Sequence, residues 1–406
     1  MKKLLLALLV TALAAWVLPA LVQKATRSPE RYPFIYYSSL LRELCVIDYG
    51  DDDEPLQDLA GKRYTTAQFD SLLPLLNYRQ LMADGHLPDS IDGIAITPPV
   101  LHAASFVFRR YPAESDAPPP VLHVLFESMP RRVGIEMPGD VFRLDDKIEF
   151  IDCRDNRVNE EKSARFQQML ERRDYHFPAR WNAGNPNPRK AYDEGYFSLD
   201  ADGRLFHIKM VNGRPYVRDT RASETVDIAA FSVLEVASKR FYGFLFGGQG
   251  EVYILEANDG AYHLARLDIA PFDLHHDQLT IMANLLYWNV AVTTPAGRVY
   301  YALRSDDLAR VAEHRVAHAP DTWERLAGRL FPLRLTLEAS NSAYIRPRLH
   351  LALAWMHAPL ALLAVAFAGG CWRRLLYAIY ILIAGIPGAI ALLVMPGIFT
   401  LKTKKK

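Results

Sequence analysis

The stretch FSLDADGRLFHI, residues 197–208, decides the fold of this chain because it recurs twice further along. The later copies are FLFGGQGEVYIL at residues 244–255 and AVTTPAGRVYYA at residues 291–302. The three copies share a turn glycine, with 47 residues between successive copies, at Gly203, Gly250 and Gly297. A fixed period of this size is typical of repeat architectures.

Each copy has the pattern of a pair of β-hairpins. A second turn follows each glycine, at Asn212-Gly213, Asp259-Gly260 and Asp306-Asp307. Asn-Gly and Asp-Gly favour the positive φ that tight hairpin turns require, and the residues between the turns alternate as half-buried strands do. Residues 232–236 and 279–283 supply a further strand per unit. A period in the forties with about four strands is typical of a β-propeller blade, and the alternative is an irregular β-meander or sandwich.

The repeat places a propeller-like β portion at residues 140–345 and leaves an α/β portion at residues 26–139. Residues 150–158 lie one period before Gly203 and are interpreted as a degenerate fourth unit. Spacing and composition predict four further segments, namely helices at 67–82 and 159–173, a strand at 121–126 and a polar loop at 181–188.

The two ends of the chain are apolar, although the whole composition is that of a soluble protein with mean hydropathy −0.03 and net charge +1. Residues 4–22, 349–370 and 375–401 contain no Asp, Glu, Lys or Arg. Each is long enough to cross a hydrocarbon core of about 30 Å as a helix. We therefore expect a membrane anchor at residues 1–25 and a C-terminal membrane hairpin with a basic tail at residues 346–406.

The first apolar segment also has features of a cleaved signal peptide, with a basic start and a Pro19-Ala20 exit. Leu18 stands where a cleavage site needs a small residue, which favours an uncleaved anchor. Cysteine spacing leaves a similar alternative open. Cys45 and Cys153 either form a disulfide in an exported domain or remain two buried thiols.

Basic residues beside the first two apolar segments predict the orientation. Lys2-Lys3 and Arg373-Arg374 are expected on the cytoplasmic side, which places the large domain on the extracytoplasmic side of the inner membrane. A third full crossing would leave the basic tail at residues 402–406 outside. Breaks at Pro387-Gly388 and Pro396-Gly397 indicate a re-entrant third segment instead, because proline removes a backbone donor.

The opposite orientation, with a cytosolic large domain, is the alternative. It keeps the tail inside and agrees with Arg346 and Arg348, but it misplaces the other two basic clusters.

Sequence motifs indicate no enzyme class: HExxH, GxSxG, GxxxxGK[ST] and CxxC are all absent. The glycines at 247–250 lie between two strands, which indicates a turn and not a phosphate loop. His275-His276-Asp277 is interpreted as a solvated loop, since neighbouring residues of a strand face opposite ways, and no metal site is expected.

Two sets of polar residues remain as site candidates. The first is the loop that contains Asn185, Asn187, Asp193 and Glu194, where a carboxylate pair beside Arg189 and Lys190 is read as a salt-bridged loop in preference to an acid–base pair.

The second set consists of His350 and His357 in an apolar segment. Their spacing of seven residues predicts one helix face, suited to a partner helix or a redox cofactor. In the plainer interpretation, His350 lies at the membrane interface and His357 forms a hydrogen bond with a neighbouring helix.

Three stretches resemble a family of bacterial membrane proteins that is a domain of unknown function. They are LPLLNYRQLM at residues 73–82, LPDSIDG at 87–93 and NPNPRKAYDEGYF at 185–197. The resemblance covers most of the chain and supplies no activity, cofactor or site residue. It implies an association with transporter components.

Together these patterns predict a non-enzymatic accessory protein. Its exported domain binds a ligand or partner, and its C-terminal hairpin contacts the bilayer and a membrane-protein partner. Nucleic acid is not among the expected partners. The alternative is a membrane-anchored enzyme with a site in the β-repeat domain that uses Asp193, Glu194 and the histidines.

Overall fold

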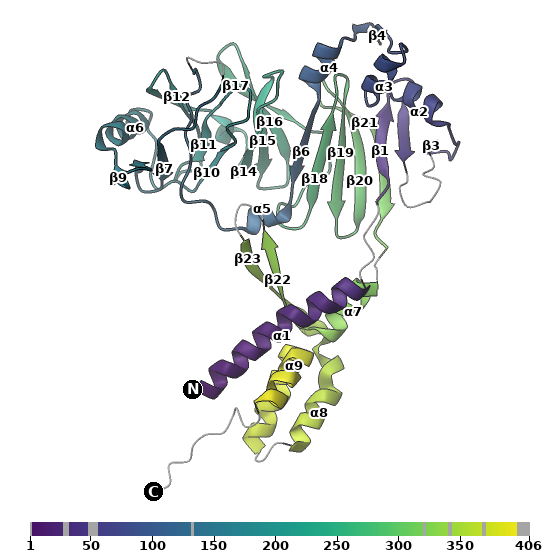
Figure 1. Ribbon diagram of the computed structural model, residues 1–406, viewed down its shortest axis with the longest axis vertical. Helices are drawn as coiled ribbons and strands as arrows, with labels where there is room; N and C mark the ends of the chain where they lie inside the picture. The colour runs from purple at the N-terminus through teal and green to yellow at the C-terminus, as the bar shows by residue number, and fades with distance from the viewer. Residues whose placement is uncertain are drawn as a thin grey trace. The chain divides into compact units, whose positions relative to one another are not determined.

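The computed structural model describes residues 2–26, 32–47, 56–130, 134–319, 322–339, 343–367 and 371–395. Its contacts divide the chain into two compact units. We call residues 32–317 the β unit, and residues 1–31 with 318–406 the helical unit. The expected boundary between residues 139 and 140 falls inside the β unit, whereas the two ends of the chain share one unit (Figure 1).

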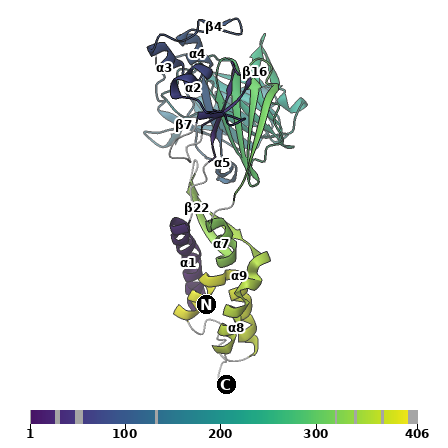
Figure 2. The same cartoon turned by 90° about the vertical axis from the view of Figure 1, so that its right-hand side faces the viewer.

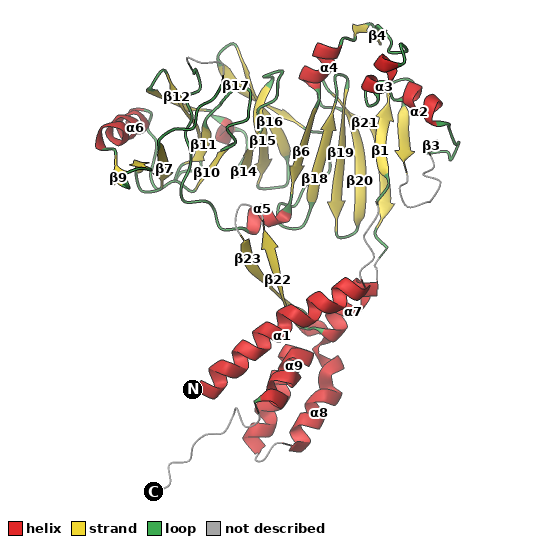
Figure 3. Cartoon of the chain, viewed as in Figure 1, coloured by secondary structure: helices red, strands yellow, loops and turns green. Residues whose placement is uncertain are grey.

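The three copies of the repeat form three antiparallel sheets, each containing a four-stranded meander (Figures 1 and 3). The first sheet consists of β10 (Trp181–Gly184), β11 (Tyr196–Leu199), β12 (Leu205–Val211) and β13 (Arg214–Asp219). The second consists of β14 (Ile228–Val233), β15 (Phe241–Gly247), β16 (Val252–Asn258) and β17 (Ala261–Arg266). The third consists of β18 (Gln278–Ala283), β19 (Tyr287–Thr294), β20 (Gly297–Arg304) and β21 (Arg310–Ala317), and β6 (Phe106–Arg110) adds to β18.

Turn chemistry fixes the register of the first two sheets. Both residues of Asn212-Gly213 and of Asp259-Gly260 have positive φ and close two-residue hairpins, as predicted. The turn at Asp306-Asp307 is longer, because β20 ends at Arg304 and β21 begins at Arg310. Gly250 turns the chain between β15 and β16, which confirms the turn predicted for the glycine run.

The predicted propeller is not confirmed. The strands form separate small sheets, and no closed barrel or propeller is found among the residues that the structure describes. The architecture is mainly β, with the large apolar core built by the second and third sheets. Buried side chains of that core include Phe244, Phe246, Ile281 and Val290.

A smaller three-stranded sheet precedes the repeat at the position of the degenerate unit. It consists of β7 (Asp140–Leu144), β8 (Ile148–Asp152) and β9 (Arg157–Val158). Helix α6 (Glu160–Arg172) follows and confirms the predicted helix; the Asn159 side chain caps its first turn. Phe166 of α6 is fully buried against Phe150 of β8.

The N-terminal part of the β unit contains short elements. They are the sheet β1 (Phe34–Ser38), β2 (Glu43–Ile47) and β3 (Leu56–Asp58), the hairpin β4 (Ser90–Ile91) and β5 (Ile94–Ala95), and the helices α2 (Thr66–Leu72), α3 (Tyr78–Ala83), α4 (Pro98–Ala104) and α5 (Pro112–Asp116). Figures 1 and 2 show α2, α3 and α4 gathered at one edge of the unit. A single 3₁₀ turn, η1 (Ala222–Glu224), lies between β13 and β14.

Three sequence predictions for the β unit are wrong in detail. The predicted helix at 67–82 is two helices, because α2 ends just before Pro74. The predicted strand at 121–126 makes only an isolated bridge from His123 to Phe142. The predicted loop at 181–188 begins as strand β10, which pairs with β11.

The three cysteines are free. Cys45 is buried, while Cys153 and Cys371 are exposed. The predicted alternative of a disulfide between Cys45 and Cys153 is therefore absent, and only Cys45 fits the description of a buried thiol.

Apolar helices dominate the helical unit. They are α1 (Lys2–Thr26), α8 (Ala358–Phe367) and α9 (Cys371–Val394), joined by α7 (Thr322–Leu330), the hairpin β22 (Leu333–Ala339) and β23 (Ala343–Leu349), and the 3₁₀ helix η2 (Leu351–His357). Helices α1 and α9 are long and apolar enough to cross a bilayer. The second apolar segment is instead divided, because Leu349 ends β23 and the 3₁₀ turn precedes α8.

Helix α9 is broken where the sequence predicts a break. Gly385 has φ +61, and Pro387 follows two residues later. A side chain at Gly385 would collide with the Pro332 ring, so both the conformation and the close packing require glycine. The other predicted break, Pro396-Gly397, and the lysine tail lie outside the described residues.

Candidate functional site

The carboxylates singled out by the sequence lie in the connection between β10 and β11. Lys190 of this connection lies between two carboxylates, with its Nζ 2.5 Å from Asp193 Oδ1 and 2.8 Å from Glu235 Oε1. The side chains of Lys190, Asp193 and Glu235 are only 5%, 1% and 1% exposed. We call these three residues the Lys190 cluster. Charged side chains can be buried to this extent only when every charge is paired and hydrogen-bonded.

The hydrogen bonds of the Lys190 cluster are complete on the carboxylate side. Asp193 accepts from the Ser128 hydroxyl and from its neighbour Gly195 N. Glu235 accepts from the Asn185 amide at 2.7 Å and from Glu194 N at 2.8 Å. Burial nevertheless raises the pKa of Glu235 above its usual range.

This arrangement confirms the salt-bridged loop and argues against acid–base catalysis by the pair. Asp193 has no face open to a substrate, and Glu194 is paired with Lys209 at 2.9 Å. Asn185 is part of the same network through Glu235. Asn187 is exposed; its Oδ1 accepts from Arg189 N, and its backbone N donates to Asn185 Oδ1. Because Glu235 follows β14, the network joins the first repeat sheet to the second.

His207 on β12 adds a further contact between the first and the second repeat sheets. Its ring is fully buried and stacks on Phe197, with 4.3 Å between ring centroids. One ring nitrogen contacts Glu194 O at 2.5 Å, and the other contacts the Tyr262 hydroxyl at 2.7 Å. Burial lowers the pKa of His207 to about 3, so the ring is neutral at physiological pH.

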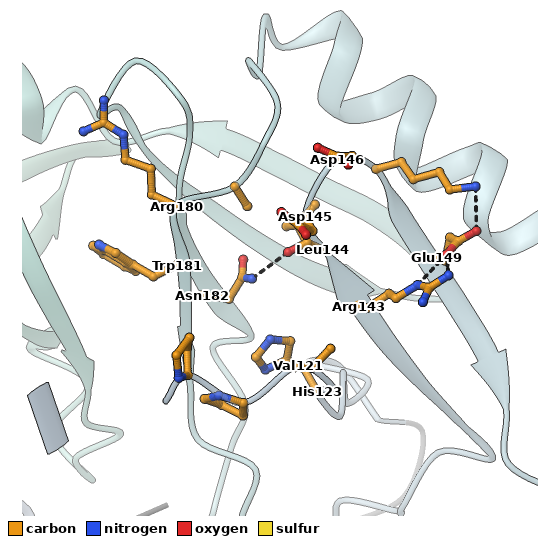
Figure 4. A pocket seen from close by; sticks show the side chains of 14 residues that line it. Val121, His123, Arg143, Leu144, Asp145, Asp146, Glu149, Arg180, Trp181 and Asn182 are labelled. Carbon is orange, nitrogen blue, oxygen red and sulfur yellow. Dashed lines mark hydrogen bonds and ion pairs between the residues drawn. The ribbon is translucent and has the colours of Figure 1, made fainter. Parts of the chain in front are cut away.

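An open cleft of about 420 Å³ is lined in part by β10 (Figure 4). Three segments contribute its side chains, within residues 119–123, 143–149 and 179–182. Its volume is in the range of small-molecule sites. None of its residues was singled out from the sequence as a site residue.

The floor of the cleft carries two polar groups. The Asn182 amide donates to Leu144 O at 2.9 Å, while its Oδ1 is buried without a hydrogen-bond partner in the described structure. Figure 4 shows the His123 imidazole beside this amide. Burial lowers the pKa of His123 to about 4, which keeps this ring neutral as well.

The two histidines of the helical unit are not brought together. His350 is exposed at the end of β23, whereas His357 is buried at the end of η2. The expectation of a shared face is wrong because η2 is a 3₁₀ helix with about 3.0 residues per turn, so a spacing of seven residues makes about two and a third turns and does not return to the same face. His357 Nε2 lies 3.1 Å from Leu330 O, a neighbouring element, as the plainer reading expects. A cofactor role for either histidine stays a prediction.

The His275-His276 segment is an exposed loop, as predicted. His275 contacts Asp116 at 2.8 Å and His276 contacts Asp273 at 2.9 Å. No group of metal-ligating side chains is found within the part of the chain that the structure describes.

Sequence reasoning missed both Glu235 and the residues of the cleft. Glu235 stands in an otherwise apolar stretch that is predicted as a strand, and a lone carboxylate there is the signal in the sequence for a buried ion pair. Trp181 and Asn182 fall in the loop predicted at residues 181–188. No local pattern places them beside Asp145 or His123, because that proximity arises from the tertiary fold.

Comparison with known proteins places most of the β unit in one family. The profile of a domain of unknown function (DUF4857) matches residues 34–303. No curated protein matches the chain.

One solved structure with some likeness is that of PorZ, a bacterial surface component of the type-IX secretion system of Porphyromonas gingivalis. It has 9% sequence identity and a TM-score of 0.21, and the match covers 77% of this chain and 37% of that chain. This likeness is too low to carry an argument.

Lys190→Met tests the structural role of the Lys190 cluster. The substitution leaves Asp193 and Glu235 buried without their cation, and we expect it to lower the free energy of unfolding by roughly 3–5 kcal/mol. Chemical unfolding of the purified full chain in detergent measures this loss.

The matched control is Lys147→Met. Lys147 is 64% exposed and its partner Glu149 retains Arg143, so a loss of less than about 1 kcal/mol is expected. Equal losses for the two variants would show that the cluster has no special structural role.

Acid should destabilise the β unit between pH 6.5 and pH 5 because of its buried neutral histidines. His207 and His123 have folded pKa values of about 3 and 4, below the unfolded value of about 6.5. Their stabilisation is therefore complete above pH 6.5 and is lost as the pH falls towards the folded values, by roughly 2 kcal/mol per histidine at pH 5. The raised pKa of Glu235 acts in the opposite direction.

Unfolding curves of the wild type, His207→Gln and His263→Gln at pH 7, 6 and 5 measure this effect. His263 is exposed on β17 and serves as the control. The His207→Gln variant should lose about half as much stability as the wild type over this range. An unchanged pH slope in that variant would contradict the assignment of a buried neutral His207.

Proposed function

The chain belongs to the DUF4857 family, a domain of unknown function, and we propose that it is a non-enzymatic, membrane-anchored component of a transport-type membrane complex. Its β unit binds a ligand or partner on the extracytoplasmic side of the inner membrane. Its apolar helices lie in the bilayer and contact a membrane-protein partner.

The observation that carries this proposal is the apolar surface of the helical unit. Leu362 on α8 is 70% exposed, and Leu393 on α9 is 80% exposed. Large exposed side chains of this kind also follow α1, among them Leu9 and Leu13. Apolar surface of this extent is unfavourable in water and favourable in hydrocarbon. At about 1.5 Å per residue, α1 and α9 are longer than the hydrocarbon core of a bilayer.

Charge beside the helices supports the proposed orientation. Lys2-Lys3 precede α1, and Arg373-Arg374 lie in the first turn of α9, so both pairs would face the cytoplasm. Arg346 and Arg348 on β23 count in the opposite direction. The break of α9 at Gly385 is of the kind found in re-entrant segments, where surrounding protein satisfies the freed backbone groups.

A propeller-like arrangement of the repeat sheets is part of the proposal. Three four-stranded meanders derived from a period of 47 residues support it. An experimental structure in which these sheets do not surround a common axis would contradict it.

The alternative of an enzyme that uses Asp193 and Glu194 has less support. Asp193 is enclosed and fully hydrogen-bonded, and Glu194 is paired with Lys209. A general acid or base must reach the proton that it transfers. Activity that survives Asp193→Asn and Glu194→Gln would eliminate this version of the enzyme.

Leu13→Arg tests the membrane anchor. A charge at the middle of α1 costs about 2.5–3.5 kcal/mol for insertion, so the carbonate-resistant membrane fraction should fall several-fold. The control is Val121→Arg, because Val121 is 72% exposed but lies in the β unit. Wild-type protein released by alkaline carbonate without detergent would contradict the anchor.

A detergent extract of the membranes tests the proposed complex. Affinity purification of the tagged wild-type chain should retain a membrane-protein partner, and a tagged single-span protein unrelated to this family provides the background. Recovery of the chain alone would contradict the proposed complex while leaving the anchor intact.

A reporter fused to Lys406 determines on which side of the membrane the C-terminus lies.

A further inference from the structure

We infer that the cleft beside β10 binds an organic cation, either a primary ammonium or a guanidinium group, through Asp145, Asp146, Asn182, His123 and Trp181. This inference rests on the proposal that the β unit binds a ligand, and it specifies the chemistry of that ligand. The side chains that line the cleft support it (Figure 4).

The carboxylates of the β7–β8 turn are available. Asp145 and Asp146 are both exposed and both line the cleft. No ion pair involves either carboxylate within the described ranges, although basic side chains stand nearby in the sequence. Among the described residues, these two charges therefore have no counterion.

The basic side chains of the cleft are already engaged. Arg143 and Lys147 both pair with Glu149, whose side chain is only 10% exposed. Arg180 donates to Ala201 O at 2.6 Å, and Figure 4 shows its guanidinium turned away from Asn182 and His123. Asp145 and Asp146 are hence the carboxylates of the lining that have no ion pair among the described residues.

The floor of the cleft offers acceptors. His123 is 6% exposed, and its ring makes no hydrogen bond among the described residues, although it lines the cleft. Asn182 donates its amide to Leu144 O, which leaves the unpaired Oδ1 as an acceptor. Since buried polar atoms are almost always satisfied, a donor from a ligand or water is expected here. A neutral imidazole contributes an acceptor nitrogen and no opposing charge.

Trp181 adds an aromatic wall. Its indole lines the cleft from β10, next to Asn182. An ammonium or guanidinium over an indole face gains from the ring quadrupole, and tryptophan is the best of the aromatic residues in this respect. Two exposed carboxylates and one ring give weak binding, so we expect millimolar dissociation constants.

Ligand-observed NMR on the purified full chain in detergent tests this inference. The probes are spermidine, which represents a free polyamine, and N-acetyl-arginine amide, which represents a side chain of a basic protein segment. N-acetyl-citrulline amide has nearly the same shape as the arginine probe but no charge. We expect both cations to bind, and citrulline to bind at least about five-fold more weakly than arginine.

The diagnostic variant is Asp145→Asn with Asp146→Asn, which preserves shape at an exposed turn. It should raise the dissociation constant of the cations about five- to ten-fold. The matched control is Asp89→Asn with Asp155→Asn, two exposed carboxylates outside the cleft that carry the same charge change. That control should leave binding unchanged within about two-fold, on the same scale.

Equal binding of citrulline and arginine, or an equal effect of the two double variants, would overturn the inference. So would the absence of binding by either cation. Stronger binding of spermidine indicates a free polyamine, and stronger binding of the arginine probe indicates a basic protein segment. If the chain still requires detergent for extraction and retains its partner while no cation binds, the inference fails and the proposed function stands.

Discussion

The β unit depends on one buried ionic contact, that of Lys190 with Asp193 and Glu235. Charges removed from water cost several kcal/mol each, and here the cost is offset only because the cation meets two carboxylates and these accept further hydrogen bonds. The contact has a definite topological meaning. Lys190 belongs to the connection inside the first repeat sheet, whereas Glu235 follows the first strand of the second sheet. Their pairing fixes one repeat against the next, which apolar packing alone does with less directional specificity.

The same contact has a consequence for the cleft. Strand β10 leads directly into the connection that carries Lys190, and it also carries Trp181 and Asn182, which line the cleft. Anchoring one end of the strand holds these two side chains against the β7–β8 turn, to which Asn182 is bonded through Leu144 O. A binding site needs side chains whose positions are fixed by their surroundings. Strand β10 is fixed at its end by the connection that carries Lys190 and near its start by the hydrogen bond of Asn182 to Leu144 O.

Local patterns predicted the β unit where local rules dominate. The 47-residue period, the Asn212-Gly213 turn and helix α6 follow from backbone preferences and from side-chain alternation, which a sequence displays directly. The strand at 121–126 was wrong because its residues have strand composition but find only one bridging partner after the proline run. The site was predicted less well. The connection containing Asp193 was identified, but Glu235 is distant in sequence and is brought there only by the fold.

Burial decides which acidic residues can meet a ligand, and the sequence does not state burial. Asp193 and Glu194 form a carboxylate pair in the sequence, yet each is already paired with a lysine in the structure. Asp145 and Asp146 resemble an ordinary solvated turn, yet they line a cleft in which Arg143 and Lys147 are paired with Glu149. Attraction between charges is weak in water and grows as the dielectric constant of the surroundings falls. A pair at the mouth of a partly enclosed cleft therefore has the better position for recognition, while the deeply enclosed pair has the better position for stability.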